Sequence, residues 1–318
     1  MTEKKNELLN TEFPQNEYLY HYTNKEALLS IVQNRSIWAS HIAFQNDRLE
    51  FKYAFKIAQD EIKNTKSKMM SKQMDNFSND LLKNISVADI YTVSFSEKKD
   101  ILSQWRAYAN SVPGFCISFR PKVLLSRIDN HSKFKFDYQG SDFTKKSKKN
   151  NSYNYKLDKC IYSTSEQRKI IREIIETSID FTRTQGLQNT YAEIINRLLP
   201  WAPLLKHEKF EEEKEWRLII FDIQNKQVKK ERIGKSNFIP YVELDLKESN
   251  CNKNCRIKYC ENKCCLNQDW IKEIVIGPCI DENTAKESTS IMCYNNGIEF
   301  NKESRRLLSI SNIPYRNY

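Results

Sequence analysis

The sequence predicts an α+β fold: a single domain with a bent or split mixed β-sheet flanked by helices. Strand-like and helix-like stretches are mixed along the chain without the regular βαβ order of a doubly wound sheet. Glycine is scarce, with 6 residues in 318, and no GxGxxG or GxxxxGK[ST] run is present, so the dinucleotide-binding and P-loop fingerprints are missing. We expect a flexible lead at residues 1–16 and one domain at 17–318, with a cysteine-rich insert at 247–268.

The composition limits the cellular setting and the class of partner. No apolar run approaches the roughly 20 residues that a membrane helix needs, and the polar N-terminal residues carry no signal region. We therefore expect a soluble, cytoplasmic protein of bacterial type with no membrane partner. The net charge of +10 suggests nucleic acid or a phosphate-bearing ligand as partner. AT-rich codons also favour Lys, Asn and Ile, so genome composition is an alternative source of this charge.

The first predicted strand carries His21 between aromatic neighbours. Thr23 and Glu26 have the spacing of a capping box, which predicts that a helix follows at once. The order is strand, turn and helix, with His21 at the carboxyl end of the strand, where side chains tend to reach a ligand cleft. A histidine in such a place is more often structural than catalytic.

The rest of the chain continues the mixture of helices and strands. Asp47 and Glu50 form a second capping pair, which predicts a helix that extends toward Lys66. Strands are predicted at 37–40, 90–96, 115–119, 238–244 and 271–276, after the acidic run 211–215 as far as Phe221, and near Ile298 and Leu307. Helices are predicted through 170–179 and 194–199, with a short helix or turn at 100–108. The basic runs 145–149 and 229–232 are expected to be solvated loops, or loops that steer an anionic substrate.

Two groups of polar residues have a spacing of two on predicted strands. Residues two apart on a strand face the same side, so Ser94 and Ser96 point together, and so do Glu213, Glu215 and Arg217. A salt-bridged sheet surface explains the second group equally well. The functional interpretation is that one carboxylate stabilises the positive charge that develops when a glycosidic bond is cleaved. Its neighbour would then position a nucleophile, and Arg217 would hold a carboxylate in place.

Five separated blocks of the sequence carry a resemblance to known proteins. They are Tyr20-His21-Tyr22-Thr23, Asn46-Asp47 with Glu50, Ser94-Phe95-Ser96 with Trp105 and Tyr108, Glu213-x-Glu215-Trp216-Arg217, and Ile274-Val275-Ile276-Gly277-Pro278. In this order, between about Tyr18 and Pro278, they resemble the bacterial domain-of-unknown-function family 2971 (DUF2971). At longer range the order is similar to NAD-dependent ADP-ribosyltransferases, which place a His or Arg first, a Ser-x-Ser or a Tyr next, and a Glu or Glu-x-Glu last.

The resemblance to the transferases implies an ADP-ribosyltransferase-like fold and a pocket for NAD. His21 would hydrogen-bond the nicotinamide-side ribose. Ser94 and Ser96 would brace the nicotinamide pocket, and Tyr108 would stack on the ring. The residues implied to bind NAD are His21, Tyr22, Thr23, Ser94, Ser96, Tyr108 and Arg217.

The same resemblance implies which side chains carry the chemistry. Glu215 would hold the ribose 2′-OH and stabilise the oxocarbenium ion, Glu213 would orient the acceptor, and His21 completes the catalytic set. Further motif residues, with no assigned step, are Asn46, Asp47, Glu50 and Trp105. The implied function is transfer of ADP-ribose from NAD to a macromolecule, a protein or a nucleic acid, in phage-defence or toxin-like biology.

Two other functions also fit the sequence. A non-enzymatic module that binds a nucleotide or nucleic acid would use the same cleft and basic loops without a poised carboxylate. A metal-dependent nuclease would bring together the carboxylates of Asp47, Glu50, Glu213 and Glu215 around a metal ion. A transferase would instead gather the histidine, the first serine and Glu215 around one cleft.

A cluster of cysteines marks the insert. Its members are Cys251, Cys255, Cys260, Cys264 and Cys265. Four of these five thiolates could hold one tetrahedral zinc ion, although the paired C-x2-C knuckles of typical zinc sites are missing. Free thiols and a disulfide are the alternatives, and a disulfide is less favoured in a cytosolic chain.

Overall fold

The computed structural model describes residues 18–45, 48–64, 89–108, 113–131, 154–182, 187–221, 223, 228–234, 236–247, 270–301 and 306–314. The contacts within the chain divide it into two compact units, and the single domain expected at 17–318 stays a prediction. The first unit comprises Met1–Trp38, Ser94–Ser152 and Glu243–Tyr318, and the second comprises Ala39–Val93 and Tyr153–Val242. Strands β2 (Ser36–His41), β3 (Tyr91–Ser96) and β8 (Phe238–Asp245) contribute residues to both units.

The first unit is built on a mixed sheet with the strand order β10-β9-β4-β1-β3. Strand β1 (Leu19–Thr23) is antiparallel to both β3 and β4 (Phe115–Phe119). Strand β4 is antiparallel to β9 (Ile271–Ile276), and β9 is parallel to β10 (Leu307–Ile310). All five residues of β4 are buried, as expected for a central strand that carries an apolar run.

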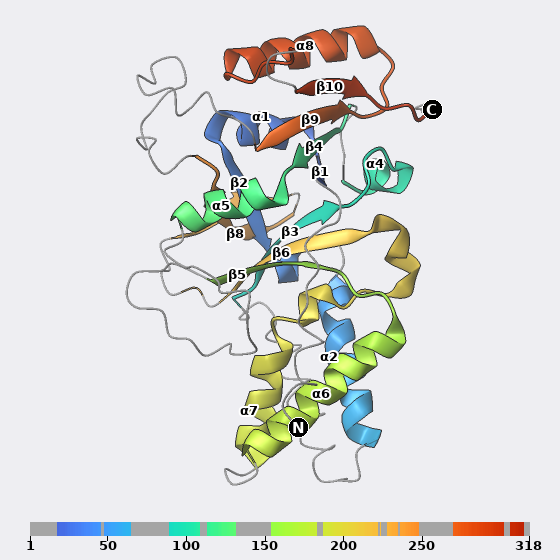
Figure 1. Ribbon diagram of the computed structural model, residues 1–318, viewed down its shortest axis with the longest axis vertical. Coiled ribbons are helices and arrows are strands. Elements are labelled where there is room, and N and C mark those ends of the chain that lie inside the picture. Colours follow the sequence, from blue (N-terminus) through green and yellow to red (C-terminus); the bar gives the residue numbers. More distant parts are fainter. Residues whose placement is uncertain are drawn as a thin grey trace. The chain divides into compact units, whose positions relative to one another are not determined.

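Four helices accompany this sheet in the described part of the first unit. They are α1 (Lys25–Asn34), α4 (Leu102–Tyr108), α5 (Pro121–His131) and α8 (Glu282–Asn295). Helix α8 contacts β10 and runs beside it in Figure 1. Together, the mixed sheet and these helices confirm the predicted α+β class.

The capping box predicted from Thr23 and Glu26 is wrong. Thr23 is the last residue of β1, and the N-cap of α1 is Asn24, whose side-chain oxygen accepts a hydrogen bond from the N–H of Ala27 at 2.8 Å. Asn is as good an N-cap as Thr, and it is one residue closer to the first helical residue. The helix itself lies where the sequence predicted it.

The strand predicted near Ile298 is also wrong, because Ile298 closes the C-terminus of α8. Gly297 has a φ of 76°, and its N–H donates to the carbonyl oxygen of Tyr294, while the N–H of Ile298 donates to that of Cys293, both at 2.9 Å. These two bonds, a glycine with positive φ and an apolar residue after it define a Schellman motif. The burial of Ile298 therefore reflects the end of a helix.

The strands of the second unit have the order β5-β6-β3-β2-β8-β7. Strand β5 (Asn154–Lys159) pairs antiparallel with β6 (Glu215–Phe221), whose first six residues are buried. Strand β7 (Lys229–Ile233) pairs antiparallel with β8. The solvated loop predicted at residues 229–232 is therefore a strand.

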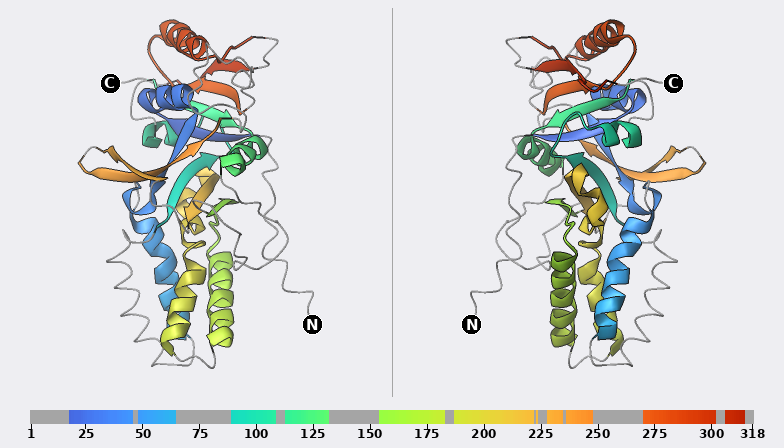
Figure 2. Two further views of the ribbon diagram at one scale, coloured as in Figure 1. Left: turned by 90° about the vertical axis from the view of Figure 1, so that its left-hand side faces the viewer. Right: turned by 90° about the vertical axis from the view of Figure 1, so that its right-hand side faces the viewer.

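A group of helices completes the second unit (Figures 1 and 2). They are α2 (Arg48–Asn64), α6 (Thr164–Thr182) and α7 (Leu187–Leu198), with short 3₁₀ helices η2 (Ile42–Phe44), η4 (Ala202–Leu204) and η5 (Glu208–Glu213). Helix α6 contacts both α2 and α7. The buried carboxylate of Glu61 in α2 accepts hydrogen bonds from Arg168 and Arg172 of α6, which ties these two helices together. No helix among the described residues is both long and apolar enough to cross a membrane.

Candidate functional site

The candidate site is a cluster of four charged side chains in the second unit, which we call the ion-pair cluster: Lys206, Glu213, Glu215 and Arg217. Lys206 follows η4, and Glu213 is the last residue of η5. Lys214, with a φ of 42°, turns the chain into β6, which begins at Glu215. Arg217 lies two residues further along β6, on the same side as Glu215. The sequence predicted Glu213 on a strand, whereas it ends a 3₁₀ helix.

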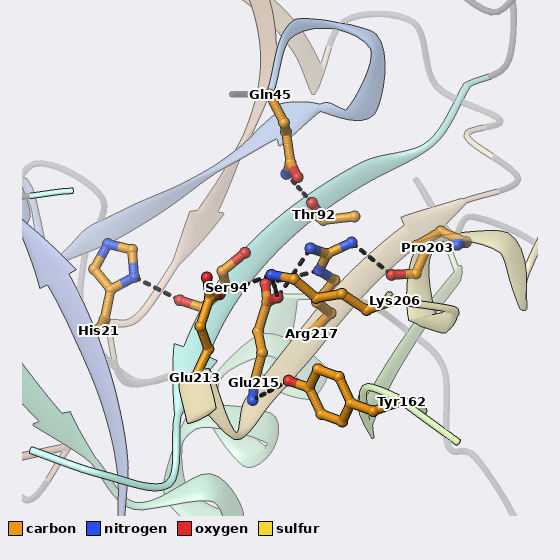
Figure 3. A network of polar contacts seen from close by, with 10 residues as sticks. All are labelled: His21, Gln45, Thr92, Ser94, Tyr162, Pro203, Lys206, Glu213, Glu215 and Arg217. Atoms are coloured by element: carbon orange, nitrogen blue, oxygen red, sulfur yellow. Dashed lines mark hydrogen bonds and ion pairs between the residues drawn. The ribbon is translucent and has the colours of Figure 1, made fainter. Parts of the chain in front are cut away.

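The two cations of the ion-pair cluster bind the two carboxylates directly (Figure 3). The Nζ of Lys206 donates to Oε2 of Glu213 and to Oε2 of Glu215, both at 2.7 Å. Arg217 donates two hydrogen bonds to Glu215, from Nε to Oε1 at 2.7 Å and from Nη2 to Oε2 at 2.9 Å. This confirms the prediction that Arg217 holds a carboxylate. Its Nη1 also donates to the carbonyl oxygen of Pro203 at 2.6 Å.

Backbone hydrogen bonds fix the two segments that carry the ion-pair cluster. The N–H of Glu215 donates to the hydroxyl oxygen of Tyr162 at 2.8 Å, and the carbonyl oxygen of Glu215 accepts from the N–H of Cys160 at 2.9 Å. The side-chain amide of Gln167, which is fully buried, donates to the carbonyl oxygens of Ile161 and Lys206 at 2.6 and 2.7 Å. Neither segment can shift without breaking several buried hydrogen bonds.

Glu215 stays ionised despite its burial. It is 3% exposed, and burial alone would raise its pKa. The charges of Arg217 and Lys206, and the hydrogen bonds that both donate, outweigh burial and lower the pKa of Glu215 to about 2. A fixed negative charge at this position therefore persists at any physiological pH.

The four members of the ion-pair cluster differ in their access to solvent. The side chains of Lys206, Glu215 and Arg217 are 1%, 4% and 4% exposed, whereas that of Glu213 is 12% exposed. Glu213 therefore forms the outer edge of the cluster, and Glu215 forms its centre. A ligand that approaches from solvent meets Glu213 first.

His21 belongs to the first unit and lies in the middle of β1, not at its carboxyl end as predicted. Its ring packs against Phe95 and Phe119, with centroid distances of 5.7 and 6.5 Å. Its Nδ1 lies 2.9 Å from the backbone carbonyl oxygen of Ser94 (Figure 3). Because a carbonyl can only accept, Nδ1 carries the proton. Burial lowers the pKa of His21, with the hydrogen bond to Ser94 opposing it, so the ring is neutral at pH 7 and its Nε2 is an acceptor.

The strand register separates His21 from the two predicted serine side chains. Tyr20 of β1 pairs with Ser96 of β3. By the alternation of a strand, Ser94 and Ser96 share the sheet face of Tyr20 and Tyr22, and His21 is directed to the opposite face. His21 thus meets Ser94 through its main-chain carbonyl only, and the two serines point together as predicted.

The predicted aromatic residues gather on the face of Tyr22. The rings of Tyr22 and Trp105 lie 4.9 Å apart at 76° and pack with Cys116 and Val275, and Tyr108 packs against this cluster. The Tyr22 hydroxyl also bridges main-chain groups of the loop before α4. Tyr22 and Trp105 are therefore packing residues of the first unit. Tyr108, which is half-buried, packs against them.

Several predicted site residues lie outside the described residues. They are Asn46, Asp47, the side chain of Glu50, and the five cysteines Cys251, Cys255, Cys260, Cys264 and Cys265. Their roles, including the zinc site, stay predictions. Within the part of the chain that the structure describes, no group of three or more His, Cys, Asp or Glu side chains could hold a metal ion.

The sequence did not reveal Lys206 or Tyr162. Lys206 directly follows Leu204 and Leu205, both buried, and a lysine next to such an apolar run was the only sign that its side chain enters the interior. No sequence pattern indicates the contact of Tyr162, because the partner of its hydroxyl is the backbone N–H of Glu215.

Comparison with known proteins gives one family match. A family model described as a protein of unknown function (DUF2971) matches residues 104–218. The matched stretch contains Trp105, Tyr108 and the whole ion-pair cluster. No curated protein and no solved structure matches the chain. The match supports the assignment of this part of the chain to DUF2971, the family that the sequence motifs resemble.

Proposed function

We propose that this protein cleaves NAD and transfers its ADP-ribose to a macromolecular acceptor, with the ion-pair cluster as the centre of the reaction. The observation that carries the proposal is a pair of neighbouring carboxylates, Glu213 and Glu215, bound to one buried lysine. The order of the sequence motifs, which is similar to that of ADP-ribosyltransferases, supports the same assignment.

The proposed reaction needs negative charge beside the scissile glycosidic bond. When the bond between the ribose C1′ and the nicotinamide nitrogen breaks, its electron pair leaves with nicotinamide and the ribose becomes an oxocarbenium ion. A nucleophile of the acceptor then bonds to C1′ and loses its proton. Fixed carboxylates aimed at the ribose favour this transition state over the ground state, because the positive charge on the ribose develops as the bond breaks.

Exposure divides the work between the two carboxylates. Glu213, the outer residue, is the one that we propose touches the ribose. Glu215 has both oxygens bound to Arg217 and Lys206, so it acts as a positioning residue that holds Lys206, and through Lys206 holds Glu213. The hypothesis drawn from the sequence assigned the ribose contact to Glu215, whereas we now assign it to Glu213. The role of His21 at the ribose rests on the resemblance alone, and His21 is not part of the site that we propose in the second unit.

The metal-dependent nuclease would need Glu213 and Glu215 to bind a metal ion together with Asp47 and Glu50, whose side chains lie outside the described residues. The carboxylates of the ion-pair cluster are neutralised by a lysine and an arginine. A dication would have to displace these cations.

The test measures nicotinamide release and attachment of labelled ADP-ribose to protein and nucleic acid acceptors. Glu213→Gln should lower kcat by roughly 10²–10³, the loss that follows removal of one preorganised electrostatic contact. Glu212→Gln is the matched control, because Glu212 is an exposed carboxylate of the same 3₁₀ helix, and it should keep full turnover. Glu215→Gln should lower kcat while the KM for NAD stays within about twofold, as expected for a positioning residue.

Two outcomes would end the proposal. One is wild-type protein that consumes no NAD with either class of acceptor. The other is a folded Glu213→Gln variant with the turnover of wild type, which would make the ion-pair cluster a structural element of the second unit.

A further inference from the structure

Arg35 follows helix α1 in the first unit and is buried. The residue is 4% exposed, whereas Gln33 and Asn34, the last two residues of α1, are exposed. Its φ of 50° lies in the left-handed region, where glycine is the usual residue after a helix. The N–H of Arg35 donates to the carbonyl oxygen of Ile31 at 2.9 Å, and its carbonyl oxygen accepts from the N–H of Leu246 at 2.8 Å. The backbone that carries this guanidinium is therefore held on both sides.

One edge of the Arg35 guanidinium has no acceptor in the described part of the chain. Its Nε and Nη2 atoms are both buried, and neither donates a hydrogen bond to a described residue. The N–H bonds of these two nitrogens run parallel on the same edge of the guanidinium and form a fork. In Arg217 the same two atoms bind the two carboxylate oxygens of Glu215, at 2.7 and 2.9 Å. Arg35 therefore presents a fork that binds an oxyanion elsewhere in this protein.

The nearby groups that could accept from this fork do not do so. An arginine at the end of a helix can donate to the last helical carbonyl oxygens, but Nε and Nη2 of Arg35 bond to none of those described. The adjacent residue, Ser36, donates from its hydroxyl to Oε1 of Glu243 at 2.7 Å. Glu243 accepts no hydrogen bond from Nε or Nη2 of Arg35. The fork is thus not used to cap the helix or to bind this carboxylate.

Arg35 differs from the other buried polar side chains that have an atom without a hydrogen-bond partner among the described residues. Ser103 and Gln167 are neutral, and Nζ of Lys156 lies 2.8 Å from a carboxylate oxygen of Asp158. A guanidinium stays charged when it is buried, and a buried charge without hydrogen bonds and a counterion is costly. An oxyanion bound at the fork would supply the negative charge and both acceptors.

We propose that Arg35 binds an oxyanion, the phosphate or carboxylate group of a small ligand, through Nε and Nη2. Two parallel N–H bonds match two oxygens of such a group. The burial of Arg35 favours a small group over the surface of a macromolecule. This inference concerns the first unit, and it does not depend on the reaction that we propose for the second unit.

Isothermal titration calorimetry of the full chain with inorganic phosphate and with acetate tests the proposal, in chloride buffer of matched ionic strength. Wild type should bind at least one of the two anions, and the tighter one identifies the group. Arg35→Lys keeps the charge but loses the fork. It should raise the Kd by about 10- to 100-fold, the loss expected for one hydrogen bond to a charged group. Arg35→Met should abolish this binding. Arg106→Met, at an exposed arginine of α4 in the same unit, is the matched control and should keep the Kd within about twofold.

Thermal melts separate a binding role of Arg35 from a structural one. In chloride buffer, Arg35→Met should melt no more than about 4 °C below wild type, because an apolar replacement of an unpaired buried charge is neutral or stabilising. The tighter anion, at about 10 to 100 times its Kd, should raise the Tm of wild type by about 3–10 °C. The same addition should leave the Tm of Arg35→Met unchanged.

Three results would overturn the proposal. The first is the absence of binding heat with both anions. The second is binding that Arg35→Met leaves unchanged, which would place the anion at another site. The third is an Arg35→Met variant that melts more than about 4 °C below wild type in chloride buffer, which would show that groups of the chain itself pair with the guanidinium.

Discussion

Replacing Glu215 by Gln removes the charge at the centre of the ion-pair cluster while nearly keeping its shape. The pKa of this carboxyl is lowered from 4.5 to about 2, and one pKa unit corresponds to about 1.4 kcal/mol, so ionisation in the folded state contributes about 3 kcal/mol at neutral pH. The substitution leaves Lys206 and Arg217 with Glu213 as the one carboxylate of the cluster. Removing one partner of a buried ion pair costs roughly 3–5 kcal/mol. Both arguments predict that Glu215→Gln lowers the free energy of unfolding at neutral pH by about 3–4 kcal/mol.

The pH dependence of this loss has a definite sign. The folded-state pKa of Glu215 lies below its unfolded value, so the stabilisation is complete above pH 4.5 and is lost as the pH falls toward 2. Wild type should therefore lose stability across this interval. The Glu215→Gln variant lacks the titrating group, so its curve should be flatter and the difference between the two proteins should shrink with falling pH.

Urea unfolding followed by tryptophan fluorescence at pH 7, 5 and 3 measures both effects. Trp216 sits beside Glu215 in β6 and is 4% exposed, so its emission reports on this region. Glu212→Gln is the control, with an expected change below 0.5 kcal/mol for an exposed site. A loss under 1 kcal/mol at pH 7, or a difference that stays constant between pH 7 and pH 3, would refute the reasoning.

Three further predictions follow from other parts of the chain. Gly277→Ala should lower the free energy of unfolding by about 1–3 kcal/mol in thermal or urea melts, because the added Cβ would lie 2.9 Å from the Trp105 ring; a neutral result would show that the ring can move aside. Glu61→Gln should cost about 1–3 kcal/mol by weakening the charge-assisted bonds between α2 and α6, which denaturant melts beside the exposed Glu166→Gln would measure. The cysteine cluster at 251–265 should hold one zinc ion per chain, and elemental analysis without zinc, together with five titratable thiols in that segment, would contradict this.

Apolar runs explain which parts of the fold could be predicted from the sequence. The strands at 90–96 and 115–119 were predicted from alternating apolar residues of β-forming type, and the structure shows that nearly all of their residues, and those of the strand at 271–276, are buried. Helix α8 was missed because ENTAKESTSIMCYN has no strong apolar stripe; its capping by Asp281 was the available signal. Strand β7 was missed because a basic edge strand has the same composition as a loop.

The candidate site shows the same limit at the level of single contacts. The contact between Arg217 and Glu215 could be predicted, because residues two apart on one strand face the same side. Lys206 could not be predicted, because it reaches Glu215 across nine residues that include a 3₁₀ helix and a residue with positive φ, Lys214. Sequence periodicity describes neighbours on one element, and it does not describe a side chain that arrives from another segment.

The Glu-x-Glu motif is therefore not a symmetric pair of carboxylates. Glu215 is bound by two cations and Glu213 by one of them, Lys206. Protonating or removing Glu215 takes a carboxylate from both buried cations and leaves Lys206 with Glu213 alone, whereas removing Glu213 leaves Lys206 paired with Glu215 and does not affect Arg217. The energetic cost should follow that difference, so Glu215→Gln should damage stability more than Glu213→Gln, while the activity that we propose should depend first on Glu213. If Glu215→Gln loses more stability and Glu213→Gln loses more turnover, Glu215 positions the other side chains and Glu213 takes part in the proposed reaction.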